Sequence, residues 1–232
     1  MRLVPVIALP AVTVVVLSGC AFPPSGPVVS EDRDISAATG VVLETSGDLT
    51  IGEGDPSLVI HAPAAVLERL TSSVDDGVLT LGVKPGTPGF RIGKISYELT
   101  LPSLESLEVD GSGDIESDIP GDDLAIAING SGEVDIDDID AGTVSLDISG
   151  SGDVELSGRA ERLDISIDGS ADVRADDLET RDVAVDLDGS GDIDVTASGT
   201  LEVSLSGSGS VSYEGDPEVT QDISGSGEVG RR

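Results

Sequence analysis

Aliphatic residues recur at fixed positions around a glycine-rich turn that occurs seven times in the second half of the chain. Successive turns are 18 to 20 residues apart, and their first glycines are Gly111, Gly130, Gly150, Gly169, Gly189, Gly207 and Gly225. The residues two and four positions before this glycine, and four positions after it, are Val, Leu or Ile in every copy except at Gln221. These positions share one parity, so in an extended chain their side chains point to one side.

This pattern predicts an all-β fold, a single-stranded parallel β-helix (solenoid) with rungs of about 18–20 residues. Helices are disfavoured because the repeats contain β-branched residues and frequent glycine, and no apolar stretch has helical spacing. Each turn then forms a corner of a rung, where small residues let the backbone bend. Ala171 replaces the second glycine of one turn, which indicates that this position does not need a positive φ angle.

The periodicity divides the chain into four expected parts. We expect a lipoprotein signal peptide over residues 1–19 and a lipidated cysteine with a flexible tether over residues 20–36. Irregular β rungs and an N-terminal cap are expected over residues 37–106, followed by regular β-helix repeats over residues 107–232. The string SGDL at residues 46–49 resembles a degenerate copy of the turn.

The first twenty residues indicate export and lipid attachment. A short basic start is followed by an apolar run of fifteen residues with two prolines, too short to span a membrane comfortably. Leu17, Ser18 and Gly19 then precede Cys20, the only cysteine, in an order that resembles a bacterial lipobox. We therefore expect an extracytoplasmic protein that is anchored to the bacterial cell membrane by a lipid such as palmitate on Cys20. A secretory peptide without lipid attachment is the alternative.

The charge of the chain limits its partners. Forty-five acidic residues stand against 12 basic ones, and the net charge is −33. This charge disfavours nucleic acid and anionic membrane surfaces and favours cations or basic partners.

An acidic residue follows the turn in six of the seven copies: Asp114, Glu133, Asp153, Asp172, Asp192 and Glu228. Stacked one rung apart, these carboxylates would repel one another, and a bound calcium ion would relieve the repulsion. The alternative is a solvated acidic face that keeps the solenoid soluble. No other cofactor is expected.

Residues for catalysis are scarce. His61 is the only histidine and lies in the apolar string LVIHAPA, which favours a structural role. The arginines Arg159, Arg162, Arg174 and Arg181 lie between turns, where we expect them to pair with neighbouring acids. A polysaccharide-active β-helix enzyme is the remaining catalytic alternative, but only four aromatic residues are present to form sugar platforms. We therefore expect a non-catalytic protein.

The strings VVLETSGDLTI, DDGVLTL and YELTLPSLESLEVDGSGDI, followed by the repeated turns, resemble the autotransporter adhesin, head GIN domain family over residues 38–229. The resemblance implies a secreted or surface β-helix, often lipid-anchored, and brings no catalytic residues. We therefore expect a binding, adhesion or structural module at the surface. Expected partners are the membrane, through the lipid on Cys20, and an envelope or cell-surface protein or glycan.

End-to-end stacking of copies is a further expectation. Only Gly-Arg-Arg follows Val229, so the C-terminal edge is either open or covered by Arg231 and Arg232.

Overall fold

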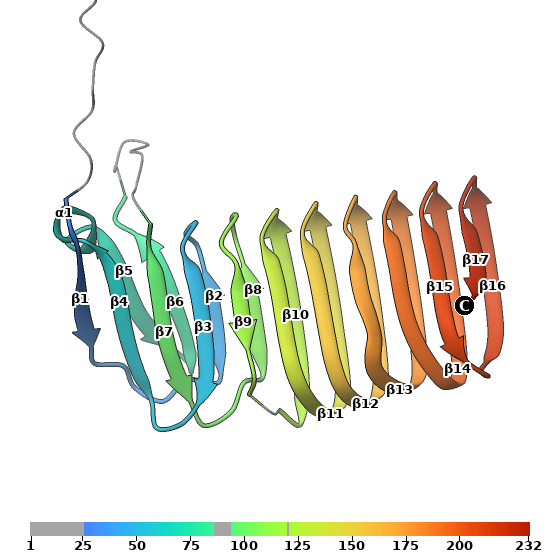
Figure 1. Cartoon of the computed structure of the whole chain (residues 1–232), viewed down its shortest axis with the longest axis horizontal. Coiled ribbons are helices and arrows are strands. Elements are labelled where there is room, and N and C mark those ends of the chain that lie inside the picture. The colour runs from blue at the N-terminus through green and yellow to red at the C-terminus, as the bar shows by residue number, and fades with distance from the viewer. Residues whose placement is uncertain (1–25, 86–93, 120) are drawn as a thin grey trace, which may run out of the picture.

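The computed structural model describes residues 26–85, 94–119 and 121–232, which form a β-solenoid of about seven turns with two facing layers of strands (Figure 1). The predicted fold class is therefore confirmed. In chain order the elements are β1 (Val28–Arg33), β2 (Gly40–Leu43), β3 (Asp48–Glu53), β4 (Ser57–Pro63), α1 (Ala64–Leu67), β5 (Leu70–Asp75), β6 (Val78–Val83), β7 (Ser96–Leu101), β8 (Ser106–Val109), β9 (Ile115–Ser117), β10 (Asp123–Gly130), β11 (Glu133–Gly150), β12 (Asp153–Gly169), β13 (Val173–Gly189), β14 (Asp192–Gly207), β15 (Ser210–Gly215), β16 (Glu218–Gly225) and β17 (Glu228–Arg231).

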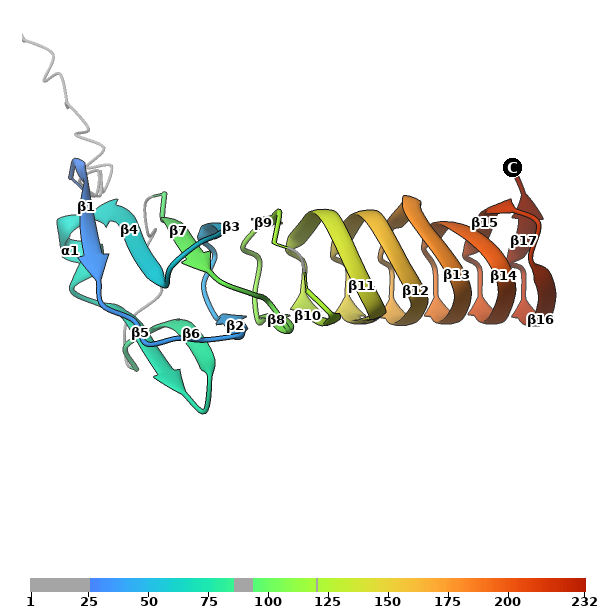
Figure 2. The same ribbon diagram turned by 90° about the horizontal axis from the view of Figure 1, so that it is seen from below.

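Each of the long strands β11 to β14 runs through both layers. Its first half lies in one layer, and the chain then turns at the edge and returns along the other layer to the next glycine turn (Figure 2). Successive rungs pair in parallel with matching positions side by side, as Ile148 with Ile167 and Gly150 with Gly169. Each rung therefore has the same structure as the preceding rung, as the period in the sequence predicts.

We name the two layers after their C-terminal strands. The β16 layer contains β5, β6, β2, β8, β10, the second halves of β11 to β14, and β16. The β17 layer contains β1, β4, β7, β3, β9, the first halves of β11 to β14, β15 and β17. All pairings are parallel except those of β5 with β6, β4 with β7 and β1 with β4, which are antiparallel and lie at the N-terminal end.

The rung made of β2 and β3 lies between elements that follow it in the sequence. β2 pairs with β6 on one side and β8 on the other, and β3 pairs with β7 and β9. The chain thus leaves the stack after β3, builds the N-terminal end, and returns on the opposite side of the first rung.

The space between the layers is filled by the aliphatic columns that the sequence predicts. Val109, Ile128, Ile148, Ile167 and Leu187 are all at most 2% exposed, and the other two columns are buried to a similar degree in every rung but the last. Burial of each such side chain stabilises the fold by about 1.5–3 kcal/mol, so the stack of columns is the main source of stability.

The glycine turns form a tight backbone column at one edge. The N–H of Ser170 donates a hydrogen bond of 2.9 Å to the carbonyl of Gly150 in the preceding rung, and the same contact recurs at every other turn from Gly130 onward. A Cβ atom on Gly169, which has a φ of +147°, would lie only 2.0 Å from that carbonyl oxygen. The second position of the turn differs because its φ is not in the left-handed region, and Ala171 occupies it fully buried. The first glycine is thus required by both space and conformation.

The folded part begins before the predicted boundary at residue 37. Val28–Arg33, which we expected to belong to a flexible tether, forms β1 and pairs antiparallel with β4. The Arg33 guanidinium holds this strand in place by donating to the carbonyls of Leu67 and Leu70, each at 3.0 Å, and to Glu31. The sequence did not indicate this strand because β1 has no alternating apolar pattern and none of its residues is fully buried.

Gly169→Ala should destabilise the protein by about 2 kcal/mol or more, because the new Cβ meets a backbone carbonyl and the φ is unfavourable for alanine. Chemical denaturation monitored by circular dichroism measures the change. Ser170→Ala, at the exposed neighbouring position, is the control and should stay within about 0.5 kcal/mol of the wild type. Equal effects of the two variants would contradict the role of the glycine column.

Deletion of residues 151–169, one complete rung, should leave a folded solenoid because it joins Gly150 to Ser170 at equivalent points of the repeat. Deletion of residues 151–160 removes half a rung and should prevent folding, since it brings unlike positions into register. Circular dichroism and the cooperativity of thermal unfolding distinguish the two proteins. Similar behaviour of both would show that rung register is not decisive.

Candidate functional site

The predicted anchor lies outside the described residues, so Leu17, Ser18, Gly19 and Cys20 stay a prediction. What the structure does show is that the first strand after them, β1, lies at the end of the solenoid opposite to β16 and β17 (Figure 1). Within residues 26–85, 94–119 and 121–232, no helix is long and apolar enough to cross a membrane.

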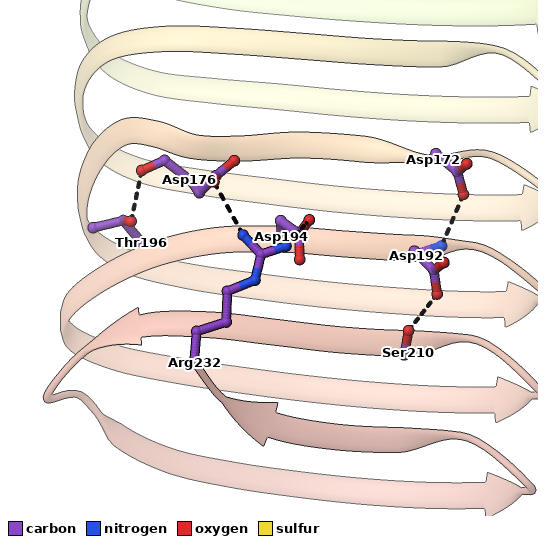
Figure 3. A network of polar contacts seen from close by, with 7 residues as sticks. All are labelled: Asp172, Asp176, Asp192, Asp194, Thr196, Ser210 and Arg232. Carbon is purple, nitrogen blue, oxygen red and sulfur yellow. Dashed lines mark hydrogen bonds and ion pairs between the residues drawn. The ribbon is translucent and has the colours of Figure 1, made fainter.

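The acidic residues that follow the turns lie one rung apart in the β17 layer. Their register is that of the strands, as shown by Glu133 beside Asp153. Several carboxylates accept hydrogen bonds from the next rung: Asp114 Oδ1 accepts from the N–H of Glu133 at 3.2 Å, and Asp172 Oδ1 accepts from the N–H of Asp192 at 3.0 Å. Asp192 accepts in turn from the hydroxyl of Ser210 (Figure 3). These acids therefore satisfy polar groups of the following strand.

The same contact occurs at the opposite edge of the rungs. Asp123 Oδ1 accepts from the N–H of Thr143 at 2.8 Å. Asp182 Oδ1 accepts from both the N–H and the hydroxyl of Thr200. The sequence analysis missed this role. The usable signal was that, in both cases, a Thr follows the Asp by 18 to 20 residues, which is one period of the repeat.

The calcium prediction for Asp114, Glu133, Asp153, Asp172, Asp192 and Glu228 stays a prediction. Among the side chains that the structure describes, no three Asp, Glu, His or Cys residues lie close enough together to hold a metal ion.

The outward face of the β16 layer carries a regular row of mostly small or acidic side chains. In register, the row consists of Glu108, Ala127, Asp147, Ser166, Asp186, Ser204 and Asp222. An acid recurs at every second rung from Asp147 onward, so neighbouring carboxylates are about 10 Å apart along the stack. This spacing is near the screening length of physiological salt, so the repulsion along the row is small. A shallow depression of about 470 Å³ overlies its C-terminal half.

Arginines offset part of the acidic charge, as the sequence predicts. Each of the four expected residues has a carboxylate within 4 Å: Arg159 with Glu179, Arg162 with Asp164, Arg174 with Glu155 and Arg181 with Asp182. Acidic crowding persists on the β17 layer, where burial, followed by the charges of Asp137 and Glu155, raises the pKa of the Asp135 carboxyl.

His61 joins three strands at the N-terminal end. Its Nδ1 lies 2.9 Å from the hydroxyl of Ser30 on β1, and its Nε2 lies 3.1 Å from Glu98 on β7. Both contacts are between strands of the β17 layer, in keeping with the structural role expected from the sequence.

The last rung, formed by β16 and β17, is largely exposed. All eight residues of β16 are exposed, including Val219 and Ile223, whose counterparts in the preceding rung are buried. The sequence analysis placed Ile223 in a core column and did not recognise that the last rung leaves it at the surface, and it made no assignment for Val219.

The two terminal arginines do not cover this rung. Arg231 pairs with Asp216 at 3.2 Å. Arg232 reaches back across the β17 layer and contacts Asp176, three rungs earlier, and Asp194, two rungs earlier (Figure 3). Of the two expectations for the C-terminal edge, the open edge is therefore the one that the side chains support.

Comparison with known proteins supports the same architecture. The crystal structure of a "putative adhesin" from Bacteroides fragilis is 24% identical, with a TM-score of 0.86, and the match covers 90% of this chain and 99% of that one. A "putative lipid binding protein" from Parabacteroides distasonis is 23% identical, with a TM-score of 0.72 and coverage of 89% and 97%. At these identities the likeness shows the fold alone. None of the curated proteins matches the chain.

A family model described as "Putative auto-transporter adhesin, head GIN domain" matches residues 38–217. The match begins just before β2 and ends just before β16, so it covers nearly all rungs but leaves out β1. The chain therefore belongs to the auto-transporter adhesin, head GIN domain family.

Proposed function

We propose that this protein is a lipid-anchored, non-catalytic adhesion module that holds its C-terminal rung away from the bacterial membrane. Membership of an adhesin family implies a location outside the cytoplasm and an adhesion-like role at the surface. The lipobox at Leu17–Cys20 supports the finer claim of a lipid anchor.

The single observation that carries the proposal is that the first and last strands lie at opposite ends of the solenoid. β1 starts eight residues after Cys20 and lies at one end of the stack, and the exposed strands β16 and β17 lie at the other end (Figure 1). A protein anchored at Cys20 would thus carry an exposed strand edge at the end that is farthest from the anchor. Regular rungs in continuous register form a stiff spacer, because each rung is hydrogen-bonded to both neighbours.

A non-catalytic role fits the chemistry of the surface. The exposed acids lie in rows, and several of them accept hydrogen bonds from the next rung or pair with arginine. The family and the structural relatives are described by adhesion or lipid binding, and none of these descriptions is that of an enzyme.

Radiolabelled palmitate should enter the wild-type protein and be absent from Cys20→Ala, because Cys20 carries the only thiol. The labelled protein should partition with the membrane fraction, and the variant should be released or retained as an unlabelled precursor. Ser18→Ala, which keeps a small residue in the lipobox, is the matched control and should label normally. Equal labelling of the wild type and Cys20→Ala would refute the anchor.

A further inference from the structure

The outer backbone edge of β16 has no strand beside it in the part of the chain that the structure describes. β16 pairs in parallel with β14 on its inner side, and each of its eight residues is exposed. Val219 and Ile223 are each 36% exposed, whereas Leu201 and Leu205 in the same columns one rung earlier are at most 1% exposed. Unpaired N–H and C=O groups beside exposed aliphatic side chains form a template for another strand.

We propose that this edge binds the same edge of a second copy of the chain, with the two β16 strands antiparallel. The two copies are then related by a two-fold axis normal to the layers. This rotation makes the paired strands antiparallel and places each layer of one copy edge to edge with the same layer of the second copy. Both aliphatic columns then continue from one copy into the other, and the interior of the last rung is covered.

The charges of β16 select one register for this pairing. With Gln221 opposite its own counterpart, Val219 lies opposite Ile223 of the second copy, which joins the two exposed aliphatic residues. In the same register Thr220 lies opposite Asp222, and Glu218 lies opposite Ser224, so no two acids are directly opposed.

The neighbouring registers are unfavourable. A shift of two residues in one direction places Glu218 opposite Asp222, and a shift in the other direction places Asp222 opposite its own counterpart; directly opposed like charges destabilise a strand pair. A shift by an odd number of residues puts inward side chains beside outward ones, which the two-layer structure forbids.

Gln221 fits the position on the two-fold axis. It is the one polar residue in the aliphatic columns around the repeated turns. A glutamine amide contains both a donor and an acceptor, so two copies that meet across the axis can pair reciprocally. In a lone chain the same residue makes the exposed edge less apolar and thus less prone to unspecific pairing.

Among the described residues, the N-terminal end also carries an outer strand that is paired on one side only, since β1 pairs with β4, and its Val28 and Val29 are exposed. However, β1 starts eight residues after Cys20, so in the proposed anchored protein it lies beside the membrane and not at the free end. A head-to-tail contact would also leave a free end in every assembly and extend into fibres, whereas a two-fold contact closes after two copies.

This pairing identifies the partner of the proposed adhesion module, and that part of the inference rests on the lipid anchor. If each copy is anchored at its N-terminal end, pairing through the C-terminal rungs joins proteins on two facing cells. The contact is only two strands wide, so a single pair is expected to be weak. Many pairs between two cell surfaces would act together and strengthen the attachment.

Cysteine cross-linking tests the register directly. The mature chain from residue 20 with Cys20→Ser contains every strand and is free of cysteine, so single cysteines can be placed in it. Gln221→Cys should form a covalent dimer on mild oxidation, because directly opposed residues of antiparallel strands have Cα atoms about 4.5–5.5 Å apart, within disulfide range. Thr220→Cys is the matched control and should not cross-link, since its own counterpart is displaced along the strand. Equal cross-linking of both variants, or of neither, would overturn the proposed register.

Sedimentation equilibrium tests the association without cross-links. The Cys20→Ser chain should dimerise, and salt should strengthen the dimer because both copies are acidic. Ile223→Glu should weaken dimerisation about tenfold or more, because a carboxylate then replaces an apolar contact, while the melting temperature stays close to that of the parent. A monomer under all salt conditions would refute the pairing, and growth into larger polymers would favour head-to-tail stacking instead.

Thr220→Lys provides a gain-of-function test, since the lysine would face Asp222 of the second copy. It should strengthen the dimer severalfold compared with Ser204→Lys, which changes the net charge equally on the outward face of β14. Equal strengthening by both variants would show that only net charge matters.

Mixing two differently labelled cell populations tests adhesion between cells. Cells that carry the wild-type protein should form mixed aggregates, and cells that carry Ile223→Glu should not, although both proteins label with palmitate. A dimer in solution without palmitate labelling would support the pairing and refute the anchor. Palmitate labelling without a dimer would support the anchor and refute the pairing.

Discussion

The backbone contact between successive glycine turns sets the register on which the rest of the solenoid depends. From the second of the seven turns onward, the N–H of the turn serine donates to the carbonyl of the first glycine one rung earlier. Because that carbonyl occupies the space in which a Cβ would lie, the turn admits only glycine at its first position. Once the corners are in register, every other position of the rung stacks on its counterpart, and the aliphatic columns follow.

In-register stacking also creates electrostatic repulsion, because acids that recur at the same position of the repeat lie beside one another in neighbouring rungs. The molecule limits this repulsion in three ways. In the row that contains Asp147 and Asp186, small residues separate the acids. At the edges, carboxylates accept hydrogen bonds from the next rung, as Asp172 does from Asp192. Elsewhere arginines lie beside acids, as Arg174 lies beside Glu155. A strongly acidic chain can thus form a solenoid because its stacked acids are separated by small residues, accept hydrogen bonds or pair with arginine.

The regular rungs could be predicted from the sequence because their information is local and repeated. Seven copies of one pattern fix the strand parity, the corner and the buried columns, and even the tolerance for Ala171 at the second turn position is visible. The N-terminal end offers no such repetition, so the antiparallel pairing of β1 with β4 was not predicted. That pairing joins residues far apart in the sequence, and the Arg33 contacts that secure it involve backbone carbonyls, which leave no trace in residue type.

The position of the β2–β3 rung gives the assembly of the chain a direction. This rung comes first among the rungs in the sequence, but its neighbours on both sides are supplied by later residues, β6 and β7 on one side and β8 and β9 on the other. In the folded chain this rung therefore has a paired strand on both sides in each layer, and the later rungs extend the stack on its C-terminal side only. If the rungs pack in chain order, the β16–β17 rung is the last to be added and keeps an unpaired face, which no described strand covers.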